Sequence, residues 1–348
     1  MGARTRSWLW PILQIGGAAA ALALLVWNFR HLELSTTLSA LAGAGPAVGW
    51  ILVPIGVALF VDSVAWQSIF GALERRVPLM ALYGIRLSSE AVLLSLSGGV
   101  VVSEGVGPVL LQRWGVPVSE SVATVAVRKL LLVVSQTVYI GLGVALGFAF
   151  LQQTSTVVLG GPGLEWLMVA AVVILGLASG AIMIGLLKGA PGSRFYGLLA
   201  RIPSRRLGSW LVQHRDPFTA LDQHFAVALG LKWTQLIGPT SLLLVAWIVE
   251  TLETWLILRV LGVELSFIQV WAFEPALSLL RHLVFFVPAG LGFQDVGYVA
   301  FLKAAGVEDA LGRGSAFVVL KRAKELFWAV LGLGLLALLG RRGKEVRA

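Results

Sequence analysis

The stretch SSEAVLLSLSGGVVVSEGVGPVLLQRWGVP, residues 88–117, has a counterpart in the second half of the chain. The counterpart is FEPALSLLRHLVFFVPAGLGFQDVGYVAFLKAAGV, residues 273–307. In both, small residues and proline break an apolar run, a carboxylate follows (Glu104, Asp295), and a Gly-Val pair comes eleven residues after that carboxylate. Interrupted apolar segments at matching places in two halves indicate the substrate site of a transporter.

The composition indicates a membrane protein. Apolar residues make up 57% of the chain, charged residues make up 13%, and the mean hydropathy is +0.87. Soluble domains carry about 25% charged residues, so we expect a polytopic membrane protein. The net charge of +9 comes from basic residues in short loops and tails, which favours topology signals and contacts with anionic lipids over nucleic-acid binding. Because the chain has no cysteine, disulfides and cysteine-based metal sites are excluded.

Hydropathy predicts about six full crossings, each close to the length needed to cross the hydrocarbon core. They lie near residues 8–27, 47–69, 129–151, 164–187, 236–259 and 315–339. Lysine and arginine set the orientation, because they concentrate on the cytoplasmic side. They gather near the N-terminus, in the loop 188–232 and in the C-terminal tail, so we predict both termini in the cytoplasm. The loop 188–232 is either a plain basic loop or includes a basic amphipathic helix on the membrane surface.

With this orientation, each repeated stretch leaves the membrane on the side from which it entered. Two half-helices that meet inside the membrane satisfy this, and so do two tightly packed full spans. The breaks at glycine and proline favour the first interpretation. The units 47–151 and 236–339 then cross in opposite directions within one transmembrane domain, residues 1–348. This is an inverted-topology repeat with two re-entrant hairpins, an arrangement common in secondary transporters.

Charged residues within the apolar segments are candidates for the site. A charge at the centre of a membrane helix costs about 2.5–3.5 kcal/mol on insertion scales, so it needs a function or a partner. The functional interpretation is a polar cavity for a headgroup or a coupling ion. The structural alternative is buried pairing, such as Arg128 with Glu104 and Arg322 with Asp295. For Asp62 the choice is between the cavity and an ion pair with a neighbouring span.

Three further charged residues have local alternatives. Glu325 follows Arg322 by three residues, so a pair within one helix is expected. Arg281 and His282 interrupt the second stretch, and they either bind a lipid phosphate or extend to the interface.

Motifs for other chemistry are absent from the sequence. It has no P-loop pattern, no zinc-binding histidine spacing and no Ser-His-Asp or GxSxG arrangement. We therefore expect no ATPase, metal site, cofactor or catalytic site in this chain.

Two longer runs carry a family resemblance. From Glu90 onward the chain has SLSGGVVVSEGVGPVLLQRWGVP and VSQTVYIGLG, and from Trp247 onward it has ETLETWLILRVLGV, FFVPAGLGFQDVGY and VLKRAKELFWAVLG. These runs resemble the signatures of the lysylphosphatidylglycerol synthase transmembrane-region family, most closely its hopanoid-biosynthesis-associated branch. The resemblance covers most of residues 50–340. It implies a flippase-like protein of the bacterial inner membrane that moves, or helps to deliver, a polar-headed lipid.

The resemblance also marks signature residues. In the first half these are Glu90, Gly98, Gly99 and Glu104, and in the second half they are Gly290, Gly292, Gln294, Asp295, Gly297, Tyr298, Lys321, Arg322 and Glu325. With the charge argument they give a predicted substrate-binding set of Glu90, Glu104, Arg128, Glu274, Arg281, Gly290, Gly292, Gln294, Asp295, Tyr298, Lys321 and Arg322. Asp295 replaces the usual Glu, Val296 replaces a Gly, and Arg128-Lys129 stands where that branch tends to carry an acid. These departures leave the cargo open among phospholipid, glycolipid and hopanoid-type lipids.

The sequence thus predicts an all-α polytopic lipid flippase or transporter without its own ATPase. The two hairpins are expected to meet near the midplane, where Glu104, Asp295, Arg128 and Arg322 line the headgroup site. Its partners are the cargo lipid and anionic lipids at the cytoplasmic face, and a homo-oligomer is compatible with the sequence. The alternatives are a membrane-embedded enzyme or accessory subunit of lipid or glycolipid biosynthesis, and a structural scaffold.

Overall fold

A computed structural model describes residues 45–96, 99–188, 191–201, 215–230, 232–283 and 292–345. All regular secondary structure in these ranges is helical, which confirms the predicted all-α class. The predicted crossing at 8–27 lies outside the described residues.

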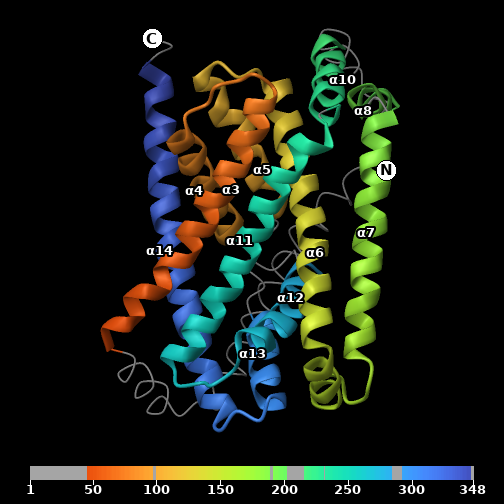
Figure 1. Cartoon of the computed structure of the whole chain (residues 1–348). Helices are drawn as coiled ribbons and strands as arrows, with labels where there is room; N and C mark the ends of the chain where they lie inside the picture. The colour runs from red at the N-terminus through yellow and green to blue at the C-terminus, as the bar shows by residue number, and fades with distance from the viewer. Residues whose placement is uncertain are drawn as a thin grey trace, which may run out of the picture.

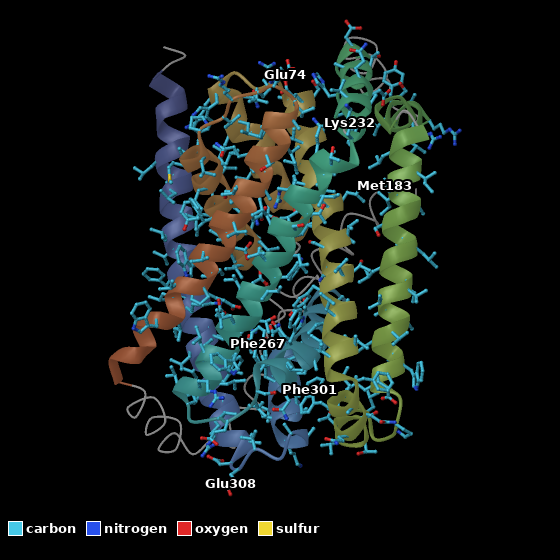
Figure 2. All side chains as sticks on the ribbon, in the orientation of Figure 1. Glu74, Met183, Lys232, Phe267, Phe301 and Glu308 are labelled. Carbon is cyan, nitrogen blue, oxygen red and sulfur yellow. The ribbon has the colours of Figure 1, made fainter. Side chains whose placement is uncertain are left out.

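The described helices form an elongated bundle (Figure 1). In chain order they are η1 (Gly45–Leu52), α3 (Val53–Ala72), α4 (Leu79–Ser95), α5 (Gly99–Leu111), η2 (Gln112–Trp114), α6 (Val118–Leu159), α7 (Leu164–Lys188), α8 (Pro191–Ala200), α10 (Arg215–Leu229), α11 (Trp233–Val260), α12 (Phe267–Leu283), α13 (Phe293–Ala304) and α14 (Ala310–Glu345). α3, α7 and α14 begin at the lower end of the view, whereas α6 and α11 begin at the upper end. Glu74 and Glu308 mark these two opposite ends (Figure 2).

Four described segments have the length and apolar composition to cross a membrane. They are Gly49–Ala72, Val118–Leu159, Leu164–Leu186 and Thr234–Val260, and each overlaps a predicted crossing. α14 is also long, at 36 residues, but four charged residues lie within its segment 321–325. That segment is where the buried ion pairs of the second half converge.

Two pairs of short helices differ from these long ones. α4 and α5 have 17 and 13 residues, and α12 and α13 have 17 and 12. At 1.5 Å per residue they are about 18–26 Å long, shorter than the ~30 Å hydrocarbon core. The α4–α5 pair lies in the upper half of the bundle and the α12–α13 pair in the lower half (Figure 1). Their re-entry into the membrane stays a prediction.

Glycines bring the short helices close to the long ones. A Cβ at Gly147 of α6 would lie 2.3 Å from the Cβ of Ala272, and one at Gly332 of α14 would lie 2.3 Å from the carbonyl oxygen of Leu87. Small residues at such crossings allow the close packing that holds helices together in membranes. α12 is therefore fixed against α6, and α4 against α14.

Candidate functional site

A polar pocket lies between helices of both halves. Its walls consist of Ile55, Glu90, Leu94, Tyr139, Trp247, Glu250, Glu253, Glu274, Ser278, Gln294, Lys321, Lys324 and Glu325. Five carboxylates therefore face two lysines. The pocket volume is about 50 Å³, which is room for a few water molecules. Typical small-molecule sites have about 300–1,000 Å³, so the pocket is contracted around its own polar groups.

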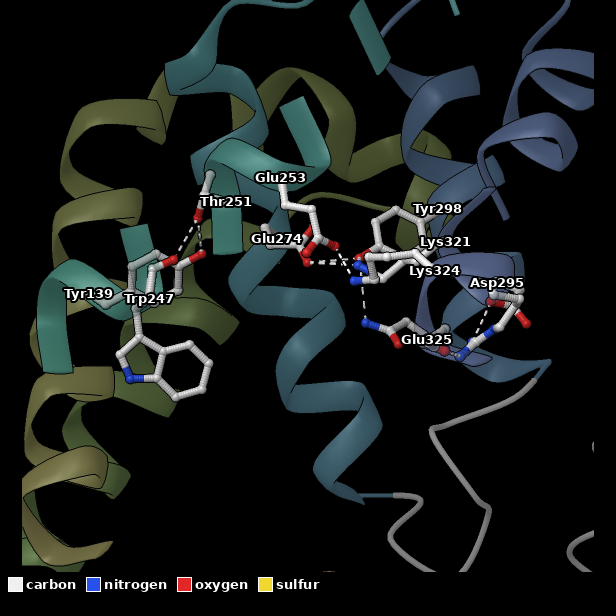
Figure 3. A network of polar contacts seen from close by, with 12 residues as sticks. Tyr139, Trp247, Thr251, Glu253, Glu274, Asp295, Tyr298, Lys321, Lys324 and Glu325 are labelled. Atoms are coloured by element: carbon white, nitrogen blue, oxygen red, sulfur yellow. Dashed lines mark hydrogen bonds and ion pairs between the residues drawn. The ribbon is translucent and has the colours of Figure 1, made fainter. Parts of the chain in front are cut away.

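Lys321 of α14 lies on one side of the pocket, in contact with the pair of short helices α12 and α13 (Figure 3). Its Nζ donates to the hydroxyl of Tyr298 at 2.8 Å, and it lies 3.6 Å from Oε1 of Glu274. The Tyr298 hydroxyl donates in turn to the same Glu274 oxygen at 2.7 Å. Because Tyr298 is 1% exposed, this network is shielded from solvent. It joins α12, α13 and α14 through one carboxylate.

Glu253 and Lys324 form a second contact in the pocket wall. The Lys324 ammonium donates to Oε1 of Glu253, and both side chains are only 4% exposed. This pair connects α11 to α14, and Figure 3 shows it beside the Lys321 network. Removing one partner of such a pair would leave an uncompensated buried charge, which is strongly destabilising.

Asp295 and Arg322 hold the start of α13 to α14. Nη2 of Arg322 lies 2.6 Å from Oδ1 of Asp295, and its Nη1 lies 2.5 Å from Oε2 of Glu325. The other Asp295 oxygen accepts the backbone N–H of Gly292, the residue before α13, at 2.9 Å, as the third residue of a helix does in a capping box. Both pairs expected for Arg322 from the sequence are thus present, one across helices and one within α14.

The first half contains a separate network of ion pairs around Asp62. The carboxylate of Asp62 accepts from Nε of Arg86 at 2.8 Å and from Nη1 of Arg128 at 2.7 Å. Glu104 lies 2.8 Å from Lys129 Nζ and 3.7 Å from Nη2 of Arg128. The network ties α3 to α4, α5 and α6. The expected Arg128–Glu104 pair is therefore present, but the shorter contact of Arg128 is with Asp62.

The two halves use the same pattern of ion pairs. In each half, one carboxylate lies on the first long helix (α3 or α11) and another lies on the second of the two short helices (α5 or α13). Both carboxylates pair with basic residues on the last long helix (α6 or α14). The pairs are Asp62–Arg128 and Glu104–Lys129 in the first half, and Glu253–Lys324 and Asp295–Arg322 in the second. The two carboxylates are separated by the same number of residues in both halves. The inverted-topology repeat over residues 47–151 and 236–339 itself stays a prediction.

The predicted site residues fall into separate groups. Glu90, Glu274, Gln294 and Lys321 line the pocket. Tyr298 lies behind the wall and holds two of these residues.

The remaining predicted residues take other positions. Glu104 and Arg128 belong to the first-half network, and Asp295, Arg322 and Gly292 fix the start of α13. Gly290 lies outside the described residues, as does the side chain of Arg281. The four charged residues expected to share one headgroup site therefore lie in two networks, and none of the four lines the pocket.

The pocket-wall residues that sequence reasoning missed include Lys324, Tyr139 and Trp247. Lys324 has a usable signal, because it follows Lys321 by three residues and so lies on the same helix face. Tyr139 stacks on Trp247 with ring centroids 5.7 Å apart, and its hydroxyl lies 2.6 Å from Oγ1 of Thr251. Nothing in the sequence distinguishes these aromatic residues from others in the spans.

Several buried polar atoms of the wall have no hydrogen-bond partner within the described ranges. They include Oε2 of Glu274, Oε1 of Gln294 and Nε1 of Trp247. Buried polar atoms in native structures are nearly always satisfied by protein or water, so these atoms are suited to a polar ligand or to solvent. The described residues contain no group of His, Asp and Glu side chains arranged to hold a metal.

Apolar spanning helices around buried, paired charges define an all-α polytopic membrane protein. The chain matches the family model described as "Lysylphosphatidylglycerol synthase TM region" over residues 13–334, and it belongs to this family. The resemblance seen in the sequence is thereby confirmed for the family, and the hopanoid-associated branch stays a prediction. No curated protein and no solved structure matches the chain. Membership supports a function connected with membrane lipids.

Proposed function

We propose that this protein moves a polar-headed lipid across the bacterial inner membrane, without an ATPase or a catalytic site of its own. The pocket receives the headgroup while the acyl chains stay in the bilayer. Both termini lie in the cytoplasm, where the basic loop and tail contact anionic lipids. The observation that carries the proposal is a charged pocket built from both halves of a membrane-spanning chain.

A pocket shared between halves suits alternating access. In an inverted repeat, movement of one half against the other exposes a shared site to each side in turn. The two matched ion pairs differ in their position relative to the pocket, because Glu253 and Lys324 line it whereas Asp62 and Arg128 do not. Such a difference is expected when two equivalent halves are in different conformations. In the opposite state the first-half pair would face the headgroup.

The charge of the pocket favours an amine-bearing headgroup. Five carboxylates face two lysines, and carboxylates remain in excess by six to four when the partners Arg86, Arg322 and Asp295 are included. The family description refers to lysylphosphatidylglycerol, a lipid whose lysyl group carries amines. A cargo ammonium would satisfy the orphaned acceptors of Glu274 and Gln294.

Cargo binding also provides a means of opening the contracted pocket. A headgroup ammonium that approaches Glu253 competes with Lys324 for the same carboxylate. Since this ion pair connects α11 to α14, its exchange would loosen the contact between these helices. The cargo thus replaces an internal partner, and no charge is left buried without compensation.

The test is translocation in liposomes that contain phosphatidylethanolamine. A membrane-impermeant amine reagent reports the exposed headgroups over time. We expect the purified protein to accelerate exposure of inner-leaflet amines, and Glu253→Gln and Glu274→Gln to slow it by tenfold or more, since each removes a charged contact of roughly 1.5–3 kcal/mol. Glu308→Gln, at an exposed position outside the pocket, is the matched control.

Two outcomes would contradict the proposal. One is the absence of protein-dependent movement for amine-bearing, neutral and anionic lipids alike. The other is movement that both pocket variants leave unchanged. Lipid binding without translocation would favour the accessory role in lipid synthesis.

A further inference from the structure

An apolar groove lies beside the polar pocket, on the surface of the bundle. It is lined by Leu52, Val53, Gly56, Val57, Phe60, Tyr83, Phe327 and Trp328. These residues come from the end of η1 and from α3, α4 and α14. Its volume of about 490 Å³ lies in the range of ligand sites, and its walls are almost entirely apolar. Val53, Val57 and Phe327 are 43–47% exposed, so the groove opens to the surroundings of the bundle.

The walls of the groove are held in place by specific contacts. The indole N–H of Trp328 donates to the carbonyl oxygen of Leu52 at 3.2 Å. A Cβ at Gly56 would lie 2.9 Å from the Trp328 ring, so only glycine leaves room for this ring against α3. Phe60 and Tyr83, which also line the groove, meet edge to face with ring centroids 5.7 Å apart. The groove is therefore preformed.

Groove and pocket are made from the same helices at neighbouring positions. On α14, Lys324 and Glu325 line the pocket, and Trp328, one turn later on the same face, lines the groove. On α4, Tyr83 and Glu90 are seven residues apart, which puts them on one face about 10 Å apart. A molecule with a charged end and an apolar tail can thus occupy both spaces at once.

We propose that this groove holds an acyl chain of the lipid whose headgroup enters the polar pocket, an inference that rests on the proposed function. α3 is an apolar spanning helix, so the exposed side of the groove faces hydrocarbon rather than water. An acyl chain matches its apolar walls, and the adjoining polar pocket selects a lipid over a purely apolar occupant. The groove thereby fixes the cargo beside the Gly56–Trp328 contact, next to the pocket wall.

Photo-crosslinking tests occupancy independently of transport. A benzophenone amino acid replaces Val57 or Phe327, and the full-length protein is placed in nanodiscs with alkyne-tagged phosphatidylethanolamine. Ile174 of α7, 65% exposed on another apolar spanning helix, is the control. We expect several-fold more lipid adduct at the groove positions than at Ile174, with the difference retained after exchange into detergent. Equal labelling at all three positions would overturn the inference, as would adducts with residues 8–27 of the same chain or with a second copy.

A groove-filling variant tests the role in transport. Val57→Trp, checked for a monodisperse elution profile, is expected to slow translocation at least tenfold, whereas Ile174→Trp keeps the wild-type rate. If Val57→Trp moves lipid at the wild-type rate while Glu253→Gln does not, the groove inference fails and the proposed function stands. If the wild-type protein moves no lipid, the proposed function fails, and the crosslinking comparison still decides whether an acyl chain occupies the groove.

Discussion

At the scale of single residues, several buried charges of the described helices have an ion-pair partner on another helix. An uncompensated charge in a membrane helix costs about 2.5–3.5 kcal/mol. Asp62 is the clearest case, because it accepts from Arg86 and Arg128 and is itself 5% exposed. Of the two interpretations considered for Asp62 from the sequence, the ion pair with a neighbouring span is the one observed.

Replacing Asp62 with Asn should therefore destabilise the fold. The substitution keeps the size of the side chain but leaves Arg128, with a side chain 3% exposed, without its closest countercharge. We expect the free energy of unfolding to fall by about 3–5 kcal/mol, the cost of breaking a buried ion pair. Denaturant unfolding in detergent measures it. Glu308→Gln, on the exposed turn before α14, should stay within about 0.5 kcal/mol of wild type. Equal stability of the two variants would contradict a structural role for Asp62.

At the scale of helices, glycine determines how closely the short helices approach the long ones. On α14, one glycine lies at a close helix contact and another glycine two residues later does not. A Cβ at Gly332 would lie 2.3 Å from the carbonyl oxygen of Leu87 and 2.6 Å from Ala91, whereas one at Gly334 has nothing within 4 Å. The α4–α14 crossing thus depends on one of these glycines and is independent of the other.

This contrast gives a matched pair of variants. Gly332→Ala should destabilise the protein by about 1–3 kcal/mol, because the added methyl group overpacks the crossing. Gly334→Ala should be neutral or stabilising by up to about 1 kcal/mol, because alanine favours the helix more than glycine does. Thermal unfolding of both variants in one detergent makes the comparison. Destabilisation of similar size in both would show that the α4–α14 contact is looser than described.

At the scale of the whole molecule, the hairpins occupy opposite halves of the bundle and the pocket lies between helices of both halves (Figure 1). The predicted orientation puts the α4–α5 end, which includes Glu74, on the cytoplasmic side. The end that includes Glu308 is then external. Because the chain has no cysteine, single cysteines can report this orientation without background labelling.

We expect Glu308→Cys to react with a membrane-impermeant maleimide in intact spheroplasts, and Glu74→Cys to react only after the membrane is opened. Both positions are exposed and lie at opposite ends of the bundle (Figure 2). Labelling in the reverse order would invert the predicted topology. Labelling of both in intact spheroplasts would contradict a membrane barrier between the two ends.

The sequence by itself determined the all-α membrane class and the local pair of Arg322 with Glu325, and it offered the Arg322–Asp295 pair as the alternative to a headgroup site. Hydropathy and the cost of buried charge depend on residue type and local order, so they can be evaluated along the chain.

The tertiary structure decided which charges line the pocket. Arg128 pairs with Asp62 across 66 residues, and Lys324 with Glu253 across 71. Such pairs depend on the rotation and approach of separate helices, which hydropathy does not specify. Packing therefore placed Glu104 and Asp295 in structural networks and put Glu253 and Lys324, on matching helices of the second half, in the pocket wall.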